Sequence, residues 1–544
     1  MNKAALYFLT IALFSCTNKG EDLPLSDIDT LALAKHIEIL ASDEFQGRRP
    51  FTLGEEKTVK YITDNFKKLG LKPGNGESYY QEVPLVELDA KPADRLIIEG
   101  NGNEMALNFG PDFITVTERV EEEVKLESSD LVFAGFGIVA PEYGWNDYEG
   151  LDVKGKTVIV LVNDPGFGSG DSTLFKGETM TYYGRWTYKY EEATRQGAAG
   201  VLIVHETAPA SYPWMVVRTS WSGASLYLDN PQDQFQPIIQ GWITRDAAIR
   251  IFEASDVDLR NFVERSRRKG FKPIDLGLKI SGSIKNGIKK NTSKNVIAKI
   301  EGVTRPDEVI VYTAHWDHFG IGNPIDGDSI YNGAHDNASG IAGLLEIARE
   351  FKKAKERPDR TVVFLAVTAE EQGLLGAKYY AENPIYPPEK TVANINMDAL
   401  NYVGLMKDLT VYGFGQSELE DIAAEIASRQ GRYIYPDPTP GAGSFFRSDH
   451  FQFAKIGIPS IFASGTYEAV NGGVEYAKKV REDYNANAYH MPADEFVRGE
   501  TEWKLGGMLQ DVELYYLLGE KLANSEVWPK WKEGSEFKLI RERD

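Results

Sequence analysis

Acidic and histidine side chains stand at the ends of three apolar, strand-like runs in the second half of this 544-residue chain. The runs VIVYTAH and VANINMD end on His315 and Asp398. Between them, TVVFLAVTAEE ends on Glu370 and Glu371. Imidazole nitrogens and carboxylate oxygens are common zinc ligands, so these runs predict a metal site where their ends meet.

Two further residues complete a set of two imidazoles and three carboxylates. Asp336 lies in GAHDNASG, just before a helix-like segment, and His490 lies in YHMPADE. A carboxylate has two oxygens to share, which makes Asp336 the best candidate to bridge two metal ions. We expect one zinc ion on His315 and Asp398, and a second on Glu371 and His490.

Glu370 and Asp317 have expected roles beside the ions. Glu370 cannot easily bind the same ion as its neighbour Glu371, so it is left free as a general base. In that role it takes a proton from the attacking water and passes it to the leaving amine. Asp317 can accept the free N–H of the His315 imidazole and fix its tautomer. Together these residues predict a di-zinc hydrolase.

The elements that must position these residues alternate between strand-like and helix-like runs. This alternation is typical of a mainly parallel sheet covered by helices on both faces, in which ligands collect at the carboxyl ends of the strands. The expected strands are 309–314, 362–367, 393–397, 409–412 and 460–462. The expected helices are 338–353, 374–382, 418–430 and 503–522, preceded by two near the N-terminus at 27–42 and 54–69.

The pattern of the sequence changes near Ser128. Three apolar, strand-like runs follow one another there: DLVFAGFG, KTVIVLVND and GAAGVLIVHE. We interpret this block as an insert with its own core. Its aromatic run at 182–186 either lines a substrate cleft or belongs to the insert core or a domain-packing face. The segment 285–294 is expected to be a solvated loop. The predicted organisation is a signal at 1–16, the first part of the main domain at 17–127, the insert at 128–272, the catalytic part at 273–525 and a charged tail at 526–544.

The N-terminus has the pattern of a targeting segment. A lysine precedes a short apolar run that ends at Cys16, as in a bacterial lipoprotein signal, although Phe14 fits that pattern imperfectly. An ordinary secretory peptide or an incidental buried thiol is the alternative. Because Cys16 is the single cysteine, an intrachain disulfide is impossible. We expect a cell-envelope lipoprotein, facing the periplasm or the surface, that contacts the membrane through a lipid on Cys16.

Composition limits the class of partner. The net charge is −21, so the protein offers no basic surface that could neutralise phosphates and release their counterions, as binding to nucleic acid requires. The apolar fraction of 42% is sufficient for folded cores, and the length favours two or three domains. Composition therefore argues against nucleic acid as a partner.

The motifs resemble peptidase family M28, in particular its secreted aminopeptidase-like members with a protease-associated (PA) domain insert. The matching segments are HWDH at 315–318, HDNASG at 335–340, AEEQGLLGA at 369–377, NMDA at 396–399, SDHFQFAKIGIP at 448–459 and YHMPADE at 489–495. The resemblance implies a three-layer α/β/α zinc-peptidase domain with a mostly parallel mixed sheet, plus an inserted PA-like α/β domain. It also implies that five residues bind two zinc ions and that Glu370 is the base. Asp317 is then expected to support the ligands without binding an ion itself. One departure is His335, where relatives often carry an acid.

Several alternatives stay open at this point. The chain could be a carboxypeptidase or dipeptidase, a one-zinc aminoacyl cyclase, or a catalytically silent, lipid-anchored binding protein. The complete ligand set argues against the cyclase, and the retained Glu370 argues against the silent protein. Arg447, Asp449 and His450 could contact substrate termini, or Arg447 and Asp449 could form a loop salt bridge. The remaining histidines are expected to be structural, surface or supporting residues: His36, His205 and His318.

Overall fold

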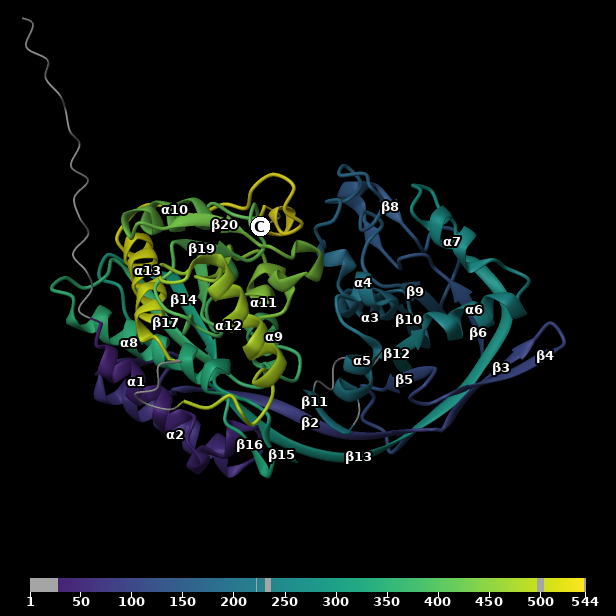
Figure 1. Cartoon of the computed structure of the whole chain (residues 1–544), viewed down its shortest axis with the longest axis horizontal. Helices are drawn as coiled ribbons and strands as arrows, with labels where there is room; N and C mark the ends of the chain where they lie inside the picture. Colours follow the sequence, from purple (N-terminus) through teal and green to yellow (C-terminus); the bar gives the residue numbers. More distant parts are fainter. Residues whose placement is uncertain (1–27, 222, 230–235, 497–502, 543–544) are drawn as a thin grey trace, which may run out of the picture.

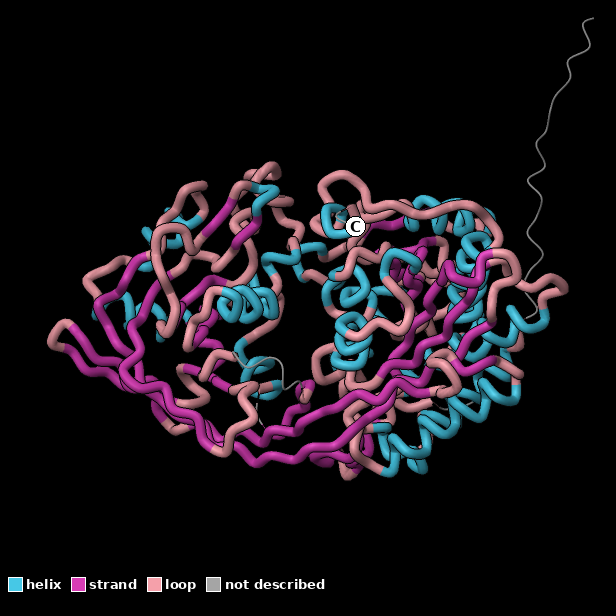
Figure 2. The backbone as a smooth tube through the Cα atoms, turned by 180° about the vertical axis from the view of Figure 1, so that it is seen from behind, coloured by secondary structure: helices cyan, strands magenta, loops and turns pink. Residues whose placement is uncertain are grey.

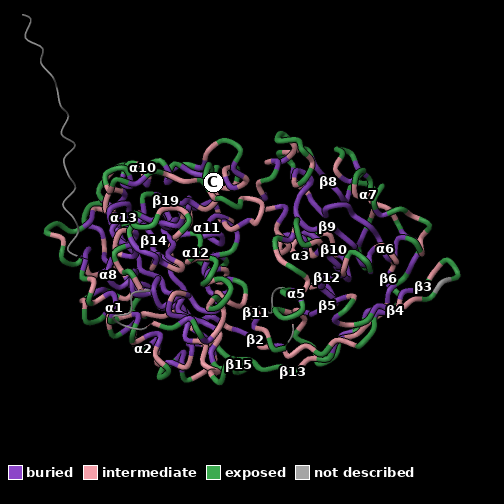
Figure 3. The backbone as a smooth tube through the Cα atoms, viewed as in Figure 1, coloured by how far each residue is buried: buried purple, intermediate pink, exposed green. Residues whose placement is uncertain are grey.

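The computed structural model describes residues 28–221, 223–229, 236–496 and 503–542. The expected signal at 1–16, with Cys16, lies outside them. The chain forms two bodies that lie side by side and are joined by long strands along one side (Figure 1). Each body has buried segments at its centre and exposed segments around it (Figure 3).

The larger body contains a mixed, mainly parallel sheet. Its four central strands are all parallel to one another, while β13 and β19 run antiparallel to their central neighbours. From edge to edge the strands are β1 (Lys72–Pro73), β13 (Ile274–Ile300), β17 (Arg360–Val367), β14 (Arg305–His315), β18 (Thr391–Asn396), β21 (Ser460–Ser464), β19 (Asp408–Val411) and β20 (Tyr433–Pro436).

Side chains that alternate along the central strands build two apolar layers. On β14, Ile310 and Tyr312 point into one layer, while Val309 and Val311 point into the other. The first layer is covered by α1 (Thr30–Leu40), α2 (Leu53–Lys68), α8 (Ser339–Lys353), α10 (Leu419–Arg429) and α13 (Leu505–Ala523). The second is covered by α9 (Leu375–Glu382) and α11 (His450–Lys455). The expected α/β/α sandwich is thus confirmed.

The expected elements of this body coincide with observed ones within a few residues. The predicted helix at 338–353 is α8, and the predicted strands at 309–314 and 362–367 are β14 and β17. Strong apolar periodicity explains the agreement. The sequence analysis did not identify α12 (Gly473–Asn487), whose buried apolar content is limited to Ala477. The short elements of this body are β15 (Gly320–Ile325), β16 (Asp328–Tyr331) and α14 (Lys538–Arg541).

The second body is an α/β unit with helices on both faces of its own strands. Its core includes Leu96 and Phe113 at one end of the chain segment and Ile284 at the other, so the packing extends past both ends of the expected 128–272 insert. Its strands are β3 (Arg95–Gly100), β4 (Asn103–Asn108), β5 (Phe113–Val116), β6 (Glu123–Phe133), β7 (Val139–Ala140), β8 (Trp145–Asn146), β9 (Thr157–Leu161), β10 (Gly200–His205) and β12 (Ile239–Thr244). Its helices are α3 (Trp186–Arg195), α4 (Thr207–Ala210), α5 (Trp214–Ser220), α6 (Arg245–Ala254) and α7 (Leu259–Ser266). The likeness of this body to a PA domain stays a prediction.

A ribbon of long strands connects the two bodies. β13 pairs with β2 (Tyr80–Pro92) from Ile284 to Val296, and β2 also pairs with β11 (Gly223–Leu228). Figure 2 shows these strands running beneath both bodies. The expected loop at 285–294 is therefore wrong, because continuous pairing with β2 holds this polar segment extended despite its low strand propensity. Most of its side chains are exposed, which suits their charge.

Aromatic and charged contacts also join the bodies at a distance from the ribbon. Tyr182 packs against Phe446 and Phe451 of the larger body, with ring centroids 6.3 and 5.3 Å away. Lys176 pairs with Glu536 at 2.6 Å. For the 182–186 run, these contacts support a domain-packing face at Tyr182, while Tyr183 lies in the core of the second body. In the described part of the chain, no helix combines the length and the apolar character that a membrane span requires.

Candidate metal centre

The carboxyl edge of the parallel strands gathers the expected ligands. His315 is the last residue of β14, and Asp398 follows β18 by two residues. Glu370 and Glu371 follow the end of β17 at Val367. Asp336 comes from the π-helical turn Ala334–Ala338 before α8, and His490 from the turn after α12. The fold thus brings together side chains that span 175 positions of sequence, from His315 to His490.

Asp336 stands between the two imidazoles. Its Oδ1 lies 3.3 Å from Nε2 of His315, and its Oδ2 lies 3.3 Å from Nε2 of His490. His315 Nε2 is also 3.3 Å from Oδ1 of Asp398, and His490 Nε2 is 3.4 Å from Oε2 of Glu371. The five side chains therefore form two groups that share one carboxylate.

The donor set and its spacing fit two zinc ions. A tetrahedral zinc with bonds of about 2.0–2.1 Å holds its ligand atoms roughly 3.3 Å apart. In each group, Nε2 of the imidazole lies 3.3–3.4 Å from the nearest oxygens of its two carboxylates. Without cations, the negative charges of several buried carboxylates would repel one another in this geometry. Two overlapping sets of three residues also have ligand atoms that all lie within 4.8 Å of one another: His315, Asp336 and Glu371, and His315, Glu370 and Asp398.

Glu370 is close to the five expected ligands and is the remaining acid of the cluster. Its Oε2 is 3.9 Å from Nε2 of His315. Burial raises the pKa of Glu370 well above its ordinary value, and the carboxylates of Asp398 and Asp449 raise it further, against the opposing effect of His315. A carboxyl group whose proton affinity is raised in this way is suited to accept and return a proton.

Asp317 supports both neighbouring ligand loops. Its backbone carbonyl lies 3.2 Å from Nδ1 of His315, while its carboxylate is 3.8 Å from that nitrogen. The carboxylate accepts the backbone N–H groups of Glu370 and Glu371 at 3.0 and 3.4 Å. Asp317 therefore orients His315 through its main chain and fixes the Glu370–Glu371 turn through its side chain.

His318 and Asn337 make supporting contacts. Nδ1 of His318 lies 2.6 Å from Oε1 of Glu371, so this histidine supports a ligand. Asn337 donates to the carbonyl of Met397 at 3.0 Å and accepts the N–H of Ala399 at 3.2 Å. These bonds tie the Asp336 turn to the turn that carries Asp398.

Sequence reasoning missed two residues that hold the Asp336 turn. Asp494 accepts the backbone N–H groups of His335 and Asp336 at 2.9 and 3.0 Å. Arg48 donates to the carbonyls of Asn332 and Gly333 from the other side. Asp494 lies in the YHMPADE motif, which offered a local signal, whereas Arg48 is almost 290 positions from Asp336 and offered none.

The other candidates lie around the site in different roles. Arg447 is exposed and donates to the carbonyl of Ala442. The buried carboxylate of Asp449 has no hydrogen-bond partner within the described residues, so a salt bridge between the two does not form. His335 packs against the rings of Tyr402 and Tyr484, with centroids 4.8 and 4.7 Å away.

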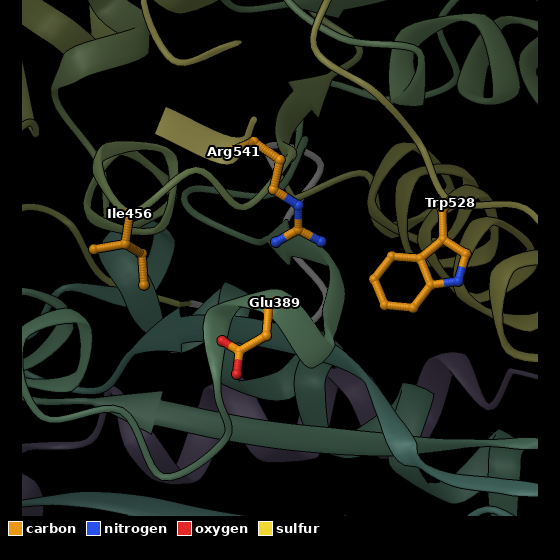
Figure 4. A pocket seen from close by; sticks show the side chains of 4 residues that line it. All are labelled: Glu389, Ile456, Trp528 and Arg541. Atoms are coloured by element: carbon orange, nitrogen blue, oxygen red, sulfur yellow. The ribbon is translucent and has the colours of Figure 1, made fainter. Parts of the chain in front are cut away.

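A separate surface pocket of about 350 Å³ lies at the opposite end of the strands. Glu389, Ile456, Trp528 and Arg541 line it (Figure 4). Glu389 comes just before the start of β18, whereas Asp398 follows its end, so a strand length separates this pocket from the candidate metal centre. We assign the chemistry to the carboxyl edge, because the ligands converge there.

Comparison with known proteins identifies the segment that carries the site. Residues 295–516 match the profile of Peptidase family M28. This part of the chain belongs to peptidase family M28. The M28 segment contains all five expected ligands together with Glu370 and Asp317.

Relatives of known name match shorter stretches of the chain. The chain is 36% identical over 137 residues to aminopeptidase NAALADL1 of Mus musculus, covering 24% of this chain and 17% of that protein. It is 34% identical over 140 residues to a probable zinc metalloprotease of Leptosphaeria maculans, covering 25% of this chain and 32% of that protein. The chain thus spans a third or less of the length of these relatives.

Solved structures match a larger share of the chain at lower identity. An aminopeptidase from Aneurinibacillus sp. strain AM-1 aligns with 92% of this chain and 95% of its own, at 19% identity and a TM-score of 0.49. A zinc aminopeptidase from Bacillus subtilis aligns with 94% of this chain and 98% of its own, at 19% identity and a TM-score of 0.42.

Proposed function

We propose that this protein is a di-zinc metallopeptidase that releases N-terminal residues from peptides. One observation carries the proposal: the two oxygens of Asp336 each face a different imidazole at 3.3 Å. That arrangement is what a carboxylate shared by two ions requires. The M28 profile match supports a peptidase.

The chain supplies three side-chain ligands for each ion if Asp336 is shared. His315, Asp398 and Asp336 would hold one ion, and His490, Glu371 and Asp336 would hold the other. When bound, such ions polarise the scissile carbonyl and lower the pKa of water. Asp317 and His318 keep the ligands oriented through the contacts described above.

Glu370 moves the proton in the proposed reaction. Its carboxylate accepts a proton from the water that attacks the peptide carbonyl. It then returns that proton to the nitrogen of the leaving amine as the C–N bond breaks. The atoms balance, since one water and one peptide bond give a carboxylic acid and an amine.

The preference for the amino terminus rests on similarity to proteins named aminopeptidases. A carboxypeptidase or dipeptidase on the same scaffold is the alternative, and a binding protein that retains zinc without turnover is another. The two kinds of peptidase differ in which terminus of a peptide must be free, and the binding protein cleaves no peptide.

A reporter assay separates these functions. The purified chain is treated with chelator, restored with zinc, and given three peptides: one with both termini free, one N-acetylated and one C-amidated. An aminopeptidase cleaves the free and the amidated peptide after zinc is restored, and leaves the acetylated one intact. Cleavage that requires a free carboxyl terminus contradicts the amino-terminal preference, and zinc binding without any cleavage supports the binding protein.

We also propose that Cys16 carries a lipid that anchors the protein in the bacterial cell envelope, and that the second body is a PA-like module beside the site. The pattern of residues 1–16 supports the lipid. In cells that express the full chain, Cys16→Ser should move the protein from the membrane fraction to the soluble fraction. An unchanged membrane fraction would contradict the anchor.

A further inference from the structure

Arg48 is a buried cation beneath the metal-ligand loops. The residue is 1% exposed, at the end of the turn Asp43–Arg48. Its Nε donates to the carbonyl of Trp316 at 2.9 Å, directly after His315. Its two Nη atoms donate to the carbonyls of Leu40 at 2.8 Å, Asn332 at 2.5 Å and Gly333 at 2.8 Å. One guanidinium thus joins the N-terminal segment to both loops.

The loop before Asp336 is held from its other side by Asp494. The carboxylate of Asp494 accepts the N–H groups of His335 and Asp336, and its carbonyl accepts that of Ala334 at 3.0 Å. Arg48 therefore fixes the carbonyls at 332 and 333, while Asp494 fixes the amides at 334–336. The backbone that presents the shared carboxylate is restrained at every peptide group from 332 to 336.

The backbone around Arg48 is itself unusual. Gln46, Gly47 and Arg48 all have positive φ, of 49°, 63° and 54°. Non-glycine residues are strained in this region and persist where the surroundings fix them. A Cβ on Gly47 would lie 2.3 Å from the carbonyl oxygen of Tyr331, so glycine is required for the close approach to the loop.

The charge of Arg48 suits the acids of the site. Burial lowers the pKa of the Arg48 guanidinium to about 10, against the stabilising effect of Asp494 and Asp317, so the group is still charged near neutral pH. Its hydrogen bonds, however, go to main-chain carbonyls. The guanidinium thus fixes backbone through its forked donors.

We propose that Arg48 is a positioning residue of the metal centre, which holds the backbone of His315 and Asp336 in place before any ion binds. The inference rests on the proposed zinc site, but it does not depend on which peptide is cleaved. It predicts that Arg48 acts on zinc affinity through Asp336 and His315. A purely structural arginine would act on stability alone.

Arg360 provides the matched control. It is also fully buried, and it donates to the carbonyls of Leu522 and Val527 at 2.7 and 2.8 Å. Its Nε also donates to the carboxylate of Glu308 at 2.6 Å. Arg360 is the first residue of β17, so it lies at the end of the sheet opposite the ligands. Arg360 thus shares the burial and the carbonyl bonding of Arg48 without contact to the ligand loops.

The experiment compares Arg48→Met, Arg48→Lys and Arg360→Met in the full chain. Zinc affinity is measured by competition with a chromogenic chelator, melting temperature in metal-free buffer, and kcat and KM at saturating zinc. We expect Arg48→Met to weaken zinc binding by about 10–100-fold. Arg48→Lys should recover part of the affinity, because it keeps the charge but loses the fork. Arg360→Met should lower the melting temperature and leave zinc affinity unchanged.

A folded Arg48→Met variant with the zinc affinity of the wild type would overturn the inference. Should that variant not fold, Arg48→Lys decides, because it keeps the buried charge and loses the forked donors that reach Trp316, Asn332 and Gly333. A folded Arg48→Lys variant with the zinc affinity of the wild type would overturn the inference. These readouts are independent of peptide cleavage, so a wild type that binds zinc but cleaves nothing refutes the proposed function alone.

Discussion

Both bodies bury acidic side chains, but they surround them differently. In the second body, Asp147 accepts the N–H groups of Phe136 and Ile138 and the indole N–H of Trp145, at 2.8–3.1 Å. Asp164 accepts two backbone N–H groups and the hydroxyl of Thr181, at 2.7–3.0 Å. Fixed donors saturate these carboxylates, which is the usual condition for a buried acid with a structural role.

At the carboxyl edge of the larger body, the acids face imidazoles and one another. Asp336 and Asp398 both approach His315 at 3.3 Å, and the buried Asp449 carboxylate has no partner within the described residues. Such clustering is unfavourable unless cations lie between the carboxylates. The donors around a buried acid, more than its burial, therefore separate a structural role from a functional one.

The largest effect should come from removing the proton carrier at the carboxyl edge. Glu370→Gln leaves the ligands in place and removes the group that accepts the proton of water, so kcat should fall roughly 10²–10⁴-fold. Zinc content, measured by metal analysis, should stay at the wild-type value. Glu389→Gln, in the pocket at the opposite end of the strands, is the control and should have wild-type kinetics. Retained activity in Glu370→Gln would remove this residue from the role of base.

The next largest effect tests the sharing of Asp336. Asp336→Asn should weaken both zinc ions, because a neutral amide bridges two dications poorly, whereas Asp398→Asn should weaken one. Zinc stoichiometry after dialysis against a weak chelator measures the difference. If Asp336→Asn keeps both ions, Asp336 is not the bridge.

The ligand residues could be predicted from the sequence, whereas Arg48, which holds their backbone, could not, and the reason is physical. His315, Glu370 and Asp398 could be found because an apolar run marks each strand, and parallel strands bring their carboxyl ends to one edge. The positions of Asp336 and His490 came from motifs. Arg48 acts through hydrogen bonds to carbonyls up to 285 positions away, and carbonyls carry no sequence signal.

The same limit applies to β13. The polar composition of 285–294 is typical of a loop, and the segment is a strand because β2 lies beside it. Long-range pairing of this kind overrides local propensity. By contrast, the helices with strong apolar periodicity, such as α8 and α13, could be placed from the sequence alone.

A smaller effect is expected in the second body. Asp164→Ala removes the acceptor of three hydrogen bonds and leaves their donors buried, so the free energy of unfolding should fall by about 1–3 kcal/mol. Urea unfolding followed by fluorescence measures this loss. Zinc content and kcat should be unchanged. A loss of zinc in this variant would contradict the contrast between saturated and unsaturated acids.

The effect that is smallest at neutral pH, and that grows as the pH falls, concerns the buried imidazole of His450. Burial lowers the pKa of His450 from 6.5 to about 3, and the ring packs against Phe445 and Phe462 with centroids 4.7 and 5.4 Å away. As pH falls below about 6.5, the unfolded chain takes up a proton at this histidine that the folded chain does not accept until about pH 3. The unfolded state thus binds more protons in this window, and folding stability decreases as the pH falls.

Replacing His450 tests this sign directly. In metal-free buffer with chelator, which removes any contribution from zinc, His450→Leu should have a flatter dependence of melting temperature on pH between 6.5 and 3 than the wild type. Above pH 7 the two dependences should run parallel, because the imidazole is neutral in both the folded and the unfolded chain. Equal slopes throughout the acid range would mean that His450 takes up its proton in the folded state, and that the carboxyl edge tolerates a buried cation at this position.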